Sequence, residues 1–454
     1  MKNKTAIQVI VIIILVVILG VLITFTIDAI NENQSMQSGK REMGEQNNGD
    51  MGGSTNDVTY TGVTEITEDT SLESGEFISE TADENAILIN GDIDVSLSNI
   101  TATKTGDSDG GDNTSFYGTN SAIIAKSGAN VTISNIEVNT DATGANGVFS
   151  YGGSATTNNT SSDGITVTIS DSTITTTEDN SGGIMTTGGG IMYANNLTIN
   201  TAGISSAAIR TDRGGGTVVV DGGTYTTTGA GSPTVYSTAD ITVSNAELNA
   251  EVAEGIVIEG KNSVTIENCN LTDSNTKLNG QSTTYKNIFL YQSMSGDAAE
   301  GDTEFTATDS TITTNNGDSF YVTNTTAIIN LTNNTIVNND SNGNLLRAQA
   351  DSWGNPGSNG GEVILNATNQ ELLGNIVIDD ISTLEMNLTS GSYFEGTING
   401  DDTAESIELV LDESSSIKLT GDSYVTSLVD SDSSYSNIDL NGYTLYVNGV
   451  ALEK

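Results

Sequence analysis

The chain has 454 residues, with 14 Lys+Arg against 59 Asp+Glu and a formal net charge of −45. It contains no His and a single Cys, Cys269, which excludes His-based acid–base catalysis, most zinc sites and an internal disulfide framework. The negative charge makes nucleic acid a poor partner, because binding a polyanion requires clustered Lys and Arg.

The first predicted element is apolar and spans residues 6–27, which carry no charge. A membrane-spanning helix needs roughly 20 such residues, and the apolar core of a signal peptide is usually about 7–15. Lys2 and Lys4 precede the segment and Asp28 follows it, so the positive-inside rule places the N-terminus in the cytoplasm. We therefore expect residues 1–30 to form a single-pass anchor in the lipid bilayer. A cleaved signal peptide is the alternative, and both interpretations place the body of the chain outside the cytosol, at the cell surface.

Residues 31–58 are polar, rich in Gly, Asn and Gln, and have no apolar period, which predicts a flexible linker.

From residue 59 to residue 454 the pattern changes to a degenerate repeat. NVTISNIEVNT (130–140) recurs as an alternating strand, a small polar corner and a second alternating strand, and a third short strand fits between consecutive units. The predicted corner residues lie 23 to 41 positions apart, and they are Asn99, Asn135, Asp171, Asn196, Gly222, Asn245, Asn268, Asp309 and Asn333. A period of this length, with apolar residues at every second position, predicts a β-solenoid.

Three strands per coil with Asn and Gly corners resemble the right-handed parallel β-helix of pectate lyases, polygalacturonases and many bacterial surface adhesins. The segment SAAIRTDRGGG (206–216) is similar to adhesin-like surface proteins of anaerobic bacteria. This resemblance covers about residues 75–450 and implies an all-β, right-handed, single-stranded parallel β-helix of about 12 coils. We expect the domain to span residues 59–454, with residues 59–80 as one cap and residues 406–454 as the closing coils and the other cap. The resemblance also implies a surface adhesin or carbohydrate-binding role, although one fold hosts many activities.

In such a coil each strand stacks on the same strand of the next coil, so inward positions should form apolar columns. The inward column of the third strand is expected to contain Ile123, Val148, Ile184, Ile209, Val235, Ile256, Ile288, Phe320, Leu345 and Ile376. For the first strand we expect Ile133, Ile169, Val220, Val243, Ile266 and Leu331. These columns explain how a chain that is 35% hydrophobic can still fold.

The outward column of the third strand carries rings and charges instead of Thr and Asn, and most insertions leave from the end of this strand. Its expected members are Ile124, Phe149, Met185, Arg210, Tyr236, Val257, Phe289, Tyr321, Leu346 and Val377. Aromatic faces stack on sugars and charged groups bind their hydroxyls or carboxylates, so we expect a groove for an extracellular glycan or a host or cell-surface ligand. The candidate binding residues are Tyr151, Arg210, Asp212, Arg213, Tyr236, Glu259, Lys261 and Tyr291. The alternative is that the inserted loops bury the column as a second core.

A polysaccharide lyase or glycoside hydrolase is the second functional hypothesis, with Asp212, Glu259, Arg210 and Lys261 as candidate catalytic residues. Asp212 and Glu259 are expected two coils apart, roughly 9–10 Å at about 4.8 Å per coil. Only a loose inverting pair of carboxylates fits that separation. A structural protein of the cell envelope is the third hypothesis.

Calcium is the one plausible cofactor. Asp107, Asp109 and Asp112 offer hard oxygen ligands on a Gly-rich loop, GDSDGGDN, although the spacing does not match an EF-hand. The alternative for these carboxylates is a solvated acidic loop without a metal.

Overall fold

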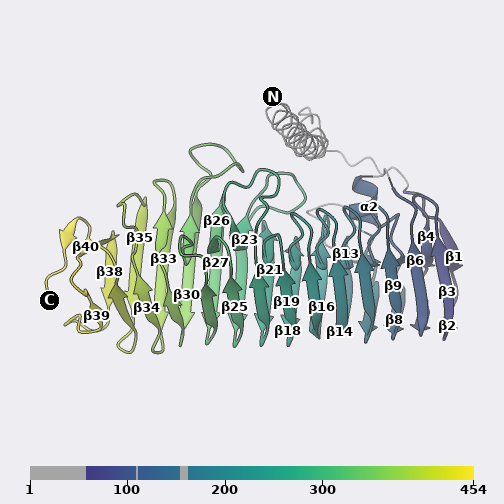
Figure 1. Cartoon of the computed structure of the whole chain (residues 1–454), viewed down its shortest axis with the longest axis horizontal. Coiled ribbons are helices and arrows are strands. Elements are labelled where there is room, and N and C mark those ends of the chain that lie inside the picture. The colour runs from purple at the N-terminus through teal and green to yellow at the C-terminus, as the bar shows by residue number, and fades with distance from the viewer. Residues whose placement is uncertain (1–57, 109–110, 154–161) are drawn as a thin grey trace, which may run out of the picture. The chain divides into compact units, whose positions relative to one another are not determined.

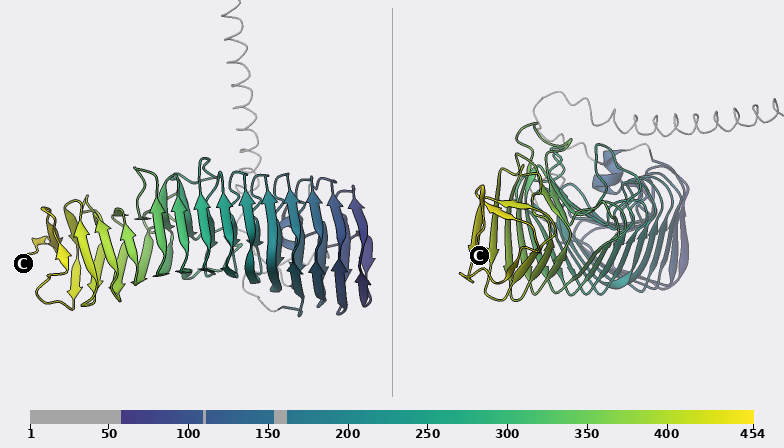
Figure 2. Two further views of the ribbon diagram at one scale, coloured as in Figure 1. Left: turned by 60° about the horizontal axis from the view of Figure 1, so that its bottom comes forward. Right: turned by 60° about the vertical axis from the view of Figure 1, so that its left-hand side comes forward.

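The computed structural model describes residues 58–108, 111–153 and 162–454, and within them the chain is almost entirely parallel β-structure. Its coils stack along one axis, from β1 (Gly62–Ile66) at one end to β40 (Leu445–Val447) near the other (Figures 1 and 2). Apart from the short α2 (Asp112–Tyr117), the described elements are strands. The predicted all-β parallel β-helix is confirmed, while the hand of the coil stays a prediction.

The predicted anchor and nearly all of the predicted linker lie outside the described residues. Within the described ranges, no helix is long and apolar enough to cross a membrane.

One strand from each coil contributes to a twelve-stranded sheet, in which every neighbouring pair is parallel. After β1 its strands are β4 (Asn85–Asn90), β7 (Ile123–Lys126), β10 (Val148–Tyr151), β13 (Ile184–Thr187), β15 (Ile209–Thr211), β17 (Val235–Ser237), β20 (Ile256–Glu259), β23 (Lys286–Tyr291), β26 (Asp318–Thr323), β29 (Leu346–Ala348) and β32 (Ile376–Ile378). From β7 to β32 these are the third strands of the predicted repeat. The sequence did not predict β1 and β4, and β1 lies in residues 59–80, where a cap was expected and the structure has strands paired with the next coil.

The other two strands of each coil form a 22-stranded sheet that bends at the corners. The strands that precede the corners are β2 (Thr70–Leu72), β5 (Asp94–Ser98), β8 (Asn130–Ser134), β11 (Thr166–Ser170), β18 (Asp240–Ser244), β21 (Ser263–Glu267), β24 (Thr303–Thr308), β27 (Thr325–Thr332), β30 (Gly361–Thr368), β33 (Thr383–Thr389), β35 (Ser406–Leu411) and β38 (Ser427–Asp430). The strands that follow them are β3 (Gly75–Ser79), β6 (Ile100–Lys104), β9 (Glu137–Thr140), β12 (Thr173–Thr176), β19 (Glu247–Ala250), β22 (Asn270–Asp273), β25 (Thr311–Thr314) and β28 (Thr335–Asn338). Two strands, β14 (Gly190–Thr201) and β16 (Gly216–Thr227), run through both positions.

The C-terminal coils form smaller sheets. One contains β31 (Glu371–Leu373), β34 (Tyr393–Gly396), β36 (Ser416–Leu419) and β39 (Ile438–Asp439), and the other contains β37 (Ser423–Val425), β40 and β41 (Val450–Ala451). Here β40 and β41 pair antiparallel, which ends the parallel stacking.

The strand register confirms the inward column of the twelve-stranded sheet up to Phe320, and these side chains are buried. The next member is Leu346, so the prediction of Leu345 inward and Leu346 outward is wrong by one residue. Leu345 N and Leu346 N both approach Asn375 O, at 2.9 and 3.4 Å, as in a bulge where two residues oppose one. The extra residue turns Arg347 outward. On the first strand, the predicted inward residues are all buried.

The predicted corners adopt the left-handed backbone conformation. Their Asn and Asp residues have φ between 49° and 56°, a region that Asn and Asp tolerate better than other non-glycine residues. The corner side chains also bond from coil to coil: Asn268 Nδ2 donates to Asn245 Oδ1 at 2.7 Å, and Asn245 Nδ2 donates to Asp221 Oδ1 at 2.5 Å. The corners therefore favour both the turn and the stacking.

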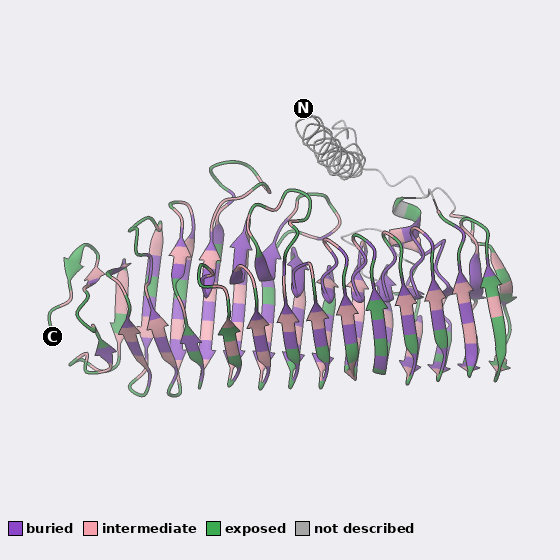
Figure 3. Ribbon diagram, viewed as in Figure 1, coloured by how far each residue is buried: buried purple, intermediate pink, exposed green. Residues whose placement is uncertain are grey.

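The two sheets differ in the burial of their outer faces (Figure 3). In β8 buried and exposed residues alternate, whereas every residue of β20, β23 and β26 is buried. Loops inserted after or before the strands of the twelve-stranded sheet cover its outer face; we call residues 105–108, 111–120, 275–285, 293–303 and 349–361 the cover loops. Gly118 packs so closely on the Phe149 ring that an added Cβ would lie 2.7 Å from it.

Asn245 tests the role of the corners. Replacing Asn245 with Gly keeps the left-handed backbone accessible and removes only the side-chain ladder. Replacing Asn245 with Ala adds backbone strain of about 1–2 kcal/mol. We expect the Ala variant to unfold in chemical denaturation at a clearly lower midpoint than the Gly variant. Equal midpoints, or a more stable Ala variant, would contradict the proposed reason for Asn at this position.

Candidate functional site

Six of the predicted site residues lie on neighbouring coils of the twelve-stranded sheet. Arg210, Tyr236, Glu259 and Tyr291 come from β15, β17, β20 and β23, which are consecutive strands of this sheet. The other two, Asp212 and Arg213, follow directly after β15.

Glu259 is the centre of a hydrogen-bonded cluster. Its Oε2 accepts from Tyr236 Oη at 2.6 Å and from Tyr291 Oη at 3.0 Å, and Ser293 Oγ donates to its Oε1. Burial raises the pKa of the Glu259 carboxyl, and the three hydroxyl donors oppose that shift. With 2% of its surface exposed, Glu259 has both oxygens committed to neighbouring side chains.

Asp212 is paired with Arg210. Arg210 Nη2 lies 2.7 Å from Asp212 Oδ2, and Arg210 Nη1 also donates to Ser205 O at 3.3 Å. Burial raises the pKa of the Asp212 carboxyl to about 6, even though the Arg210 guanidinium acts in the opposite direction. Both side chains are largely enclosed, so the pair contributes to the architecture of this face.

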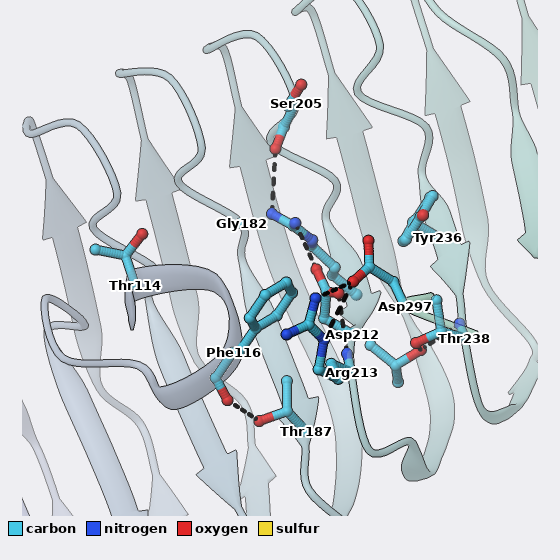
Figure 4. A network of polar contacts seen from close by, with 12 residues as sticks. Thr114, Phe116, Gly182, Thr187, Ser205, Asp212, Arg213, Tyr236, Thr238 and Asp297 are labelled. Carbon is cyan, nitrogen blue, oxygen red and sulfur yellow. Dashed lines mark hydrogen bonds and ion pairs between the residues drawn. The ribbon is translucent and has the colours of Figure 1, made fainter. Parts of the chain in front are cut away.

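Arg213 joins two cover loops to the solenoid (Figure 4). Its Nη2 lies 2.7 Å from Asp297 Oδ1, and its guanidinium carbon lies 4.0 Å from the centre of the Phe116 ring. Phe116 belongs to α2 and Asp297 to residues 293–303, so one side chain bridges insertions from distant coils. Thr187 Oγ1 also donates to Phe116 O at 2.7 Å and fixes α2 on the sheet.

Beyond Tyr291 the outer face is an aromatic cluster. The Phe289 and Tyr291 rings stack with centroids 4.3 Å apart, and Trp353 approaches each of them at 5.2 Å. Tyr321 is fully buried, and its hydroxyl donates to Asp351 Oδ2 at 2.6 Å. Trp353 and Asp351 belong to residues 349–361, so this cover loop closes over the rings.

Lys286 is the cation within this cluster. Its Nζ lies 4.3 Å from the Phe289 centroid and 4.7 Å from the Tyr321 centroid, and it donates to Ser282 Oγ and to Thr284 O. Burial lowers the pKa of the Lys286 ammonium, and Glu254 opposes that shift from 3.9 Å away.

Four participants were missed at the sequence level: Glu254, Lys286, Asp318 and Arg347. Arg347 Nε lies 2.6 Å from Asp318 Oδ2, which places a third Arg–carboxylate pair on this face. Arg347 was missed because of the bulge before β29. Regular alternation without a bulge predicts that the Arg347 side chain points into the coil. Lys286 and Asp318 precede the alternating part of their strands, so periodicity gave no signal for them.

A pocket of about 60 Å³ opens beside the cluster. Its lining residues are Gly231, Pro233, Tyr236, Glu254, Val257, Asn279, Ser282, Phe289, Tyr291 and Trp353. Ligand pockets that enclose a whole small molecule usually measure about 300–1,000 Å³, so this pocket admits only part of one.

Two predicted binding residues lie elsewhere. Tyr151 belongs to a separate aromatic group with Tyr60 and Tyr117, at centroid distances of 6.4 and 5.7 Å. Lys261 lies on the exposed turn after β20, where its aliphatic stem packs beside the position of Gly301. Of the eight predicted binding residues, only Tyr236 and Tyr291 line the pocket described above. Arg210, Asp212, Arg213 and Glu259 lie on or beside the neighbouring strands, outside its lining.

The predicted calcium ligands are only partly described. Asp109 lies outside the described residues, as does the side chain of Asp112. Asp107 is exposed, and its Oδ1 accepts from Thr143 N at 2.8 Å. Across the described ranges, no group of three or more acidic or Cys residues is arranged to hold a metal ion. Calcium binding stays a prediction.

The geometry bears on the choice between binding and catalysis. Asp212 is committed to Arg210, and Glu259 to three hydroxyl groups, so neither carboxylate is positioned on an open substrate cleft. The outward column is buried under the cover loops along much of its length, the arrangement expected of a second core. The small aromatic pocket opens beside this covered face.

Comparison of the chain with protein-family models, curated proteins and solved structures finds no match. The function must therefore be inferred from the site itself.

The buried carboxyl groups predict how stability depends on pH. The folded-state pKa of Asp212 is about 6 and that of Asp273 about 8, both raised mainly by burial. Their stabilising contribution is complete below the unfolded pKa of about 4 and is lost as pH rises through the folded values. We expect a higher denaturation midpoint at pH 5 than at pH 8, with a smaller difference in Asp212→Asn.

Asp412 provides a control, because its pKa shifts in the opposite direction. Burial raises the pKa of the Asp412 carboxyl, but hydrogen bonds from Ser390, Ser414 and Ser415 outweigh burial and lower the pKa to about 2. Asp412→Asn should lose stability at neutral pH and leave the loss between pH 5 and 8 intact. A wild-type midpoint that rises from pH 5 to 8 would contradict the burial of these carboxyls.

Proposed function

We propose that this chain is a membrane-anchored, extracytosolic β-helix that binds an extracellular glycan or cell-surface ligand at the pocket beside Tyr236, Tyr291 and Trp353. The observation that carries the proposal is the concentration of rings, cations and carboxylates on the covered face of the twelve-stranded sheet. The other outer faces of the coil carry mostly Thr, Asn, Ser and acidic residues. Rings combined with a few polar groups are typical of sugar binding.

Binding is favoured over turnover by the state of the two candidate catalytic carboxylates. A general acid and a base or nucleophile must both reach the glycosidic oxygen or carbon. Asp212 and Glu259 are instead enclosed and hydrogen-bonded within the protein. The uncharged apolar segment 6–27, preceded by Lys2 and Lys4, supports anchoring in a bilayer.

Contacts within the protein hold the cover-loop residues that line the pocket. Lys286 Nζ donates to Ser282 Oγ and lies 5.9 Å from the Trp353 ring centroid, so the ring and the hydroxyl have partners without a ligand. Ordering the site in advance reduces the conformational entropy lost on binding.

Trp353→Ala tests this proposal on the purified full chain, by binding to an array of neutral and acidic glycans. We expect the variant to bind its glycan about two- to tenfold more weakly, because an aromatic contact of about 0.5–1.5 kcal/mol is lost. Tyr446→Ala is the matched control: its ring stacks on Tyr424 at 4.8 Å near the C-terminal end, far along the chain from the pocket. This control should bind like the parent.

The same samples should release no unsaturated or reducing product from the bound polysaccharide. Product formation would favour a lyase or hydrolase. A parent chain that binds no glycan, with the fold intact by circular dichroism, would overturn the proposal and favour a structural role in the cell envelope.

A further inference from the structure

The pocket beside Trp353 has a definite size. Its volume is about 60 Å³, and a cavity needs roughly 10–15 Å³ of such volume for one water molecule. The space therefore accepts about four to six non-hydrogen atoms. A pyranose ring is too large to enter, whereas a compact substituent of such a ring fits, and an acetamido group has the right size.

The pocket lining has an apolar part and a polar part. Val257, Phe289 and Trp353 supply apolar surface against which a methyl group can pack. Asn279 and Ser282 supply a side-chain amide and a hydroxyl toward the rim, both able to donate to a carbonyl oxygen. An acetamido group has the same division, with a methyl group at one end and a polar amide at the other.

Glu254 is the buried carboxylate of the pocket lining. Only 2% of its surface is exposed, and the nearest cation, Lys286 Nζ, lies 3.9 Å from its Oε1. That separation exceeds hydrogen-bond length, while Lys286 Nζ donates instead to Ser282 and Thr284. The Asn275 side chain and the Glu254 backbone N–H donate to this carboxyl. A carboxylate offers about four acceptor positions, so Glu254 can still accept from an entering amide N–H.

The charge around the rings disfavours a cationic ligand. Aromatic pockets with a carboxylate often bind ammonium groups. Here the Lys286 ammonium already lies 4.3 Å from the Phe289 centroid and 5.9 Å from the Trp353 centroid. A second ammonium at the same rings would be repelled at close range, whereas a neutral amide is not.

We propose that this pocket is a subsite for the acetamido group of an N-acetylated sugar, with the methyl group against Val257, Phe289 and Trp353 and the amide between Glu254 and Asn279. The inference rests on the glycan-binding function proposed above and names its ligand class. The sugar ring remains outside the pocket, beside Asn279 and Gly231 at the rim.

The test compares three oligosaccharides of equal length and β-1,4 linkage on the full chain: N-acetylglucosamine, its deacetylated glucosamine form, and glucose. We expect at least tenfold tighter binding of the acetylated form than of either other form, measured by calorimetry at constant ionic strength. The glucosamine form carries a cation in place of the amide, and the glucose form lacks both, so the two comparisons separate charge from shape.

Asn279→Ala should reduce the preference for the acetylated form, because it removes a rim donor from an exposed position and should not disturb folding. Tyr285→Ala is the matched control, since Tyr285 is 36% exposed on the same cover loop and does not line the pocket. It should retain the full preference.

Equal binding of all three oligosaccharides would overturn the acetamido subsite and leave the glycan-binding function standing. A preference that survives unchanged in Asn279→Ala would overturn its assignment to this pocket. If the parent binds no sugar on the wider glycan array, the proposed function fails, and this inference fails with it.

Discussion

Parallel pairing between successive coils is the constraint on which the rest of the structure depends. Because each strand bonds to its equivalent one coil away, every residue stacks on the residue at the same position of the next coil. An apolar residue at an inward position then extends a continuous column, and a charge there would have no counterpart. The corner must bend the chain in the same way in every coil, which explains the repeated left-handed Asn and Asp residues.

The twelve-stranded sheet departs from a simple solenoid because its outer face, like its inner face, is buried over much of its length. Its inward face packs in the coil, and its outward face packs under the cover loops. Polar groups enclosed there need partners, and the chain has only 14 basic residues for 59 acidic ones. Several of those scarce cations, Arg210, Arg213, Lys286 and Arg347, lie on this one face, each beside a carboxylate. The face with the most varied chemistry is thus also the most enclosed.

Much of this fold could be predicted from the sequence, because period-two alternation and corner residues are local signals. The inward column was correct through Phe320 and failed at Leu345, where a bulge adds one residue that alternation cannot reveal. The destination of the inserted loops was not predictable, since Trp353 and Phe116 reach the sheet only through tertiary packing. One signal did point to burial: Ile124, Phe149 and Met185 stand at outward positions where the other faces carry Thr and Asn.

Only part of the candidate site could be predicted from the sequence, because strand order is a local signal and side-chain contacts are not. Strand order brought Arg210, Tyr236, Glu259 and Tyr291 together as expected. Spacing alone could not show that Glu259 accepts from both tyrosines or that Asp212 is paired with Arg210.

Hydroxyl-radical footprinting of the full chain tests the central claim, the burial of the outward face, most directly. Tyr291 and Tyr321 are 8% and 0% exposed, Tyr225 in the interior of the coil is 0% exposed, and Tyr193 on the open sheet is 43% exposed. The account predicts that Tyr291 and Tyr321 are oxidised as slowly as Tyr225 and far more slowly than Tyr193. Oxidation of Tyr291 and Tyr321 at the rate of Tyr193 would show an open face and contradict it.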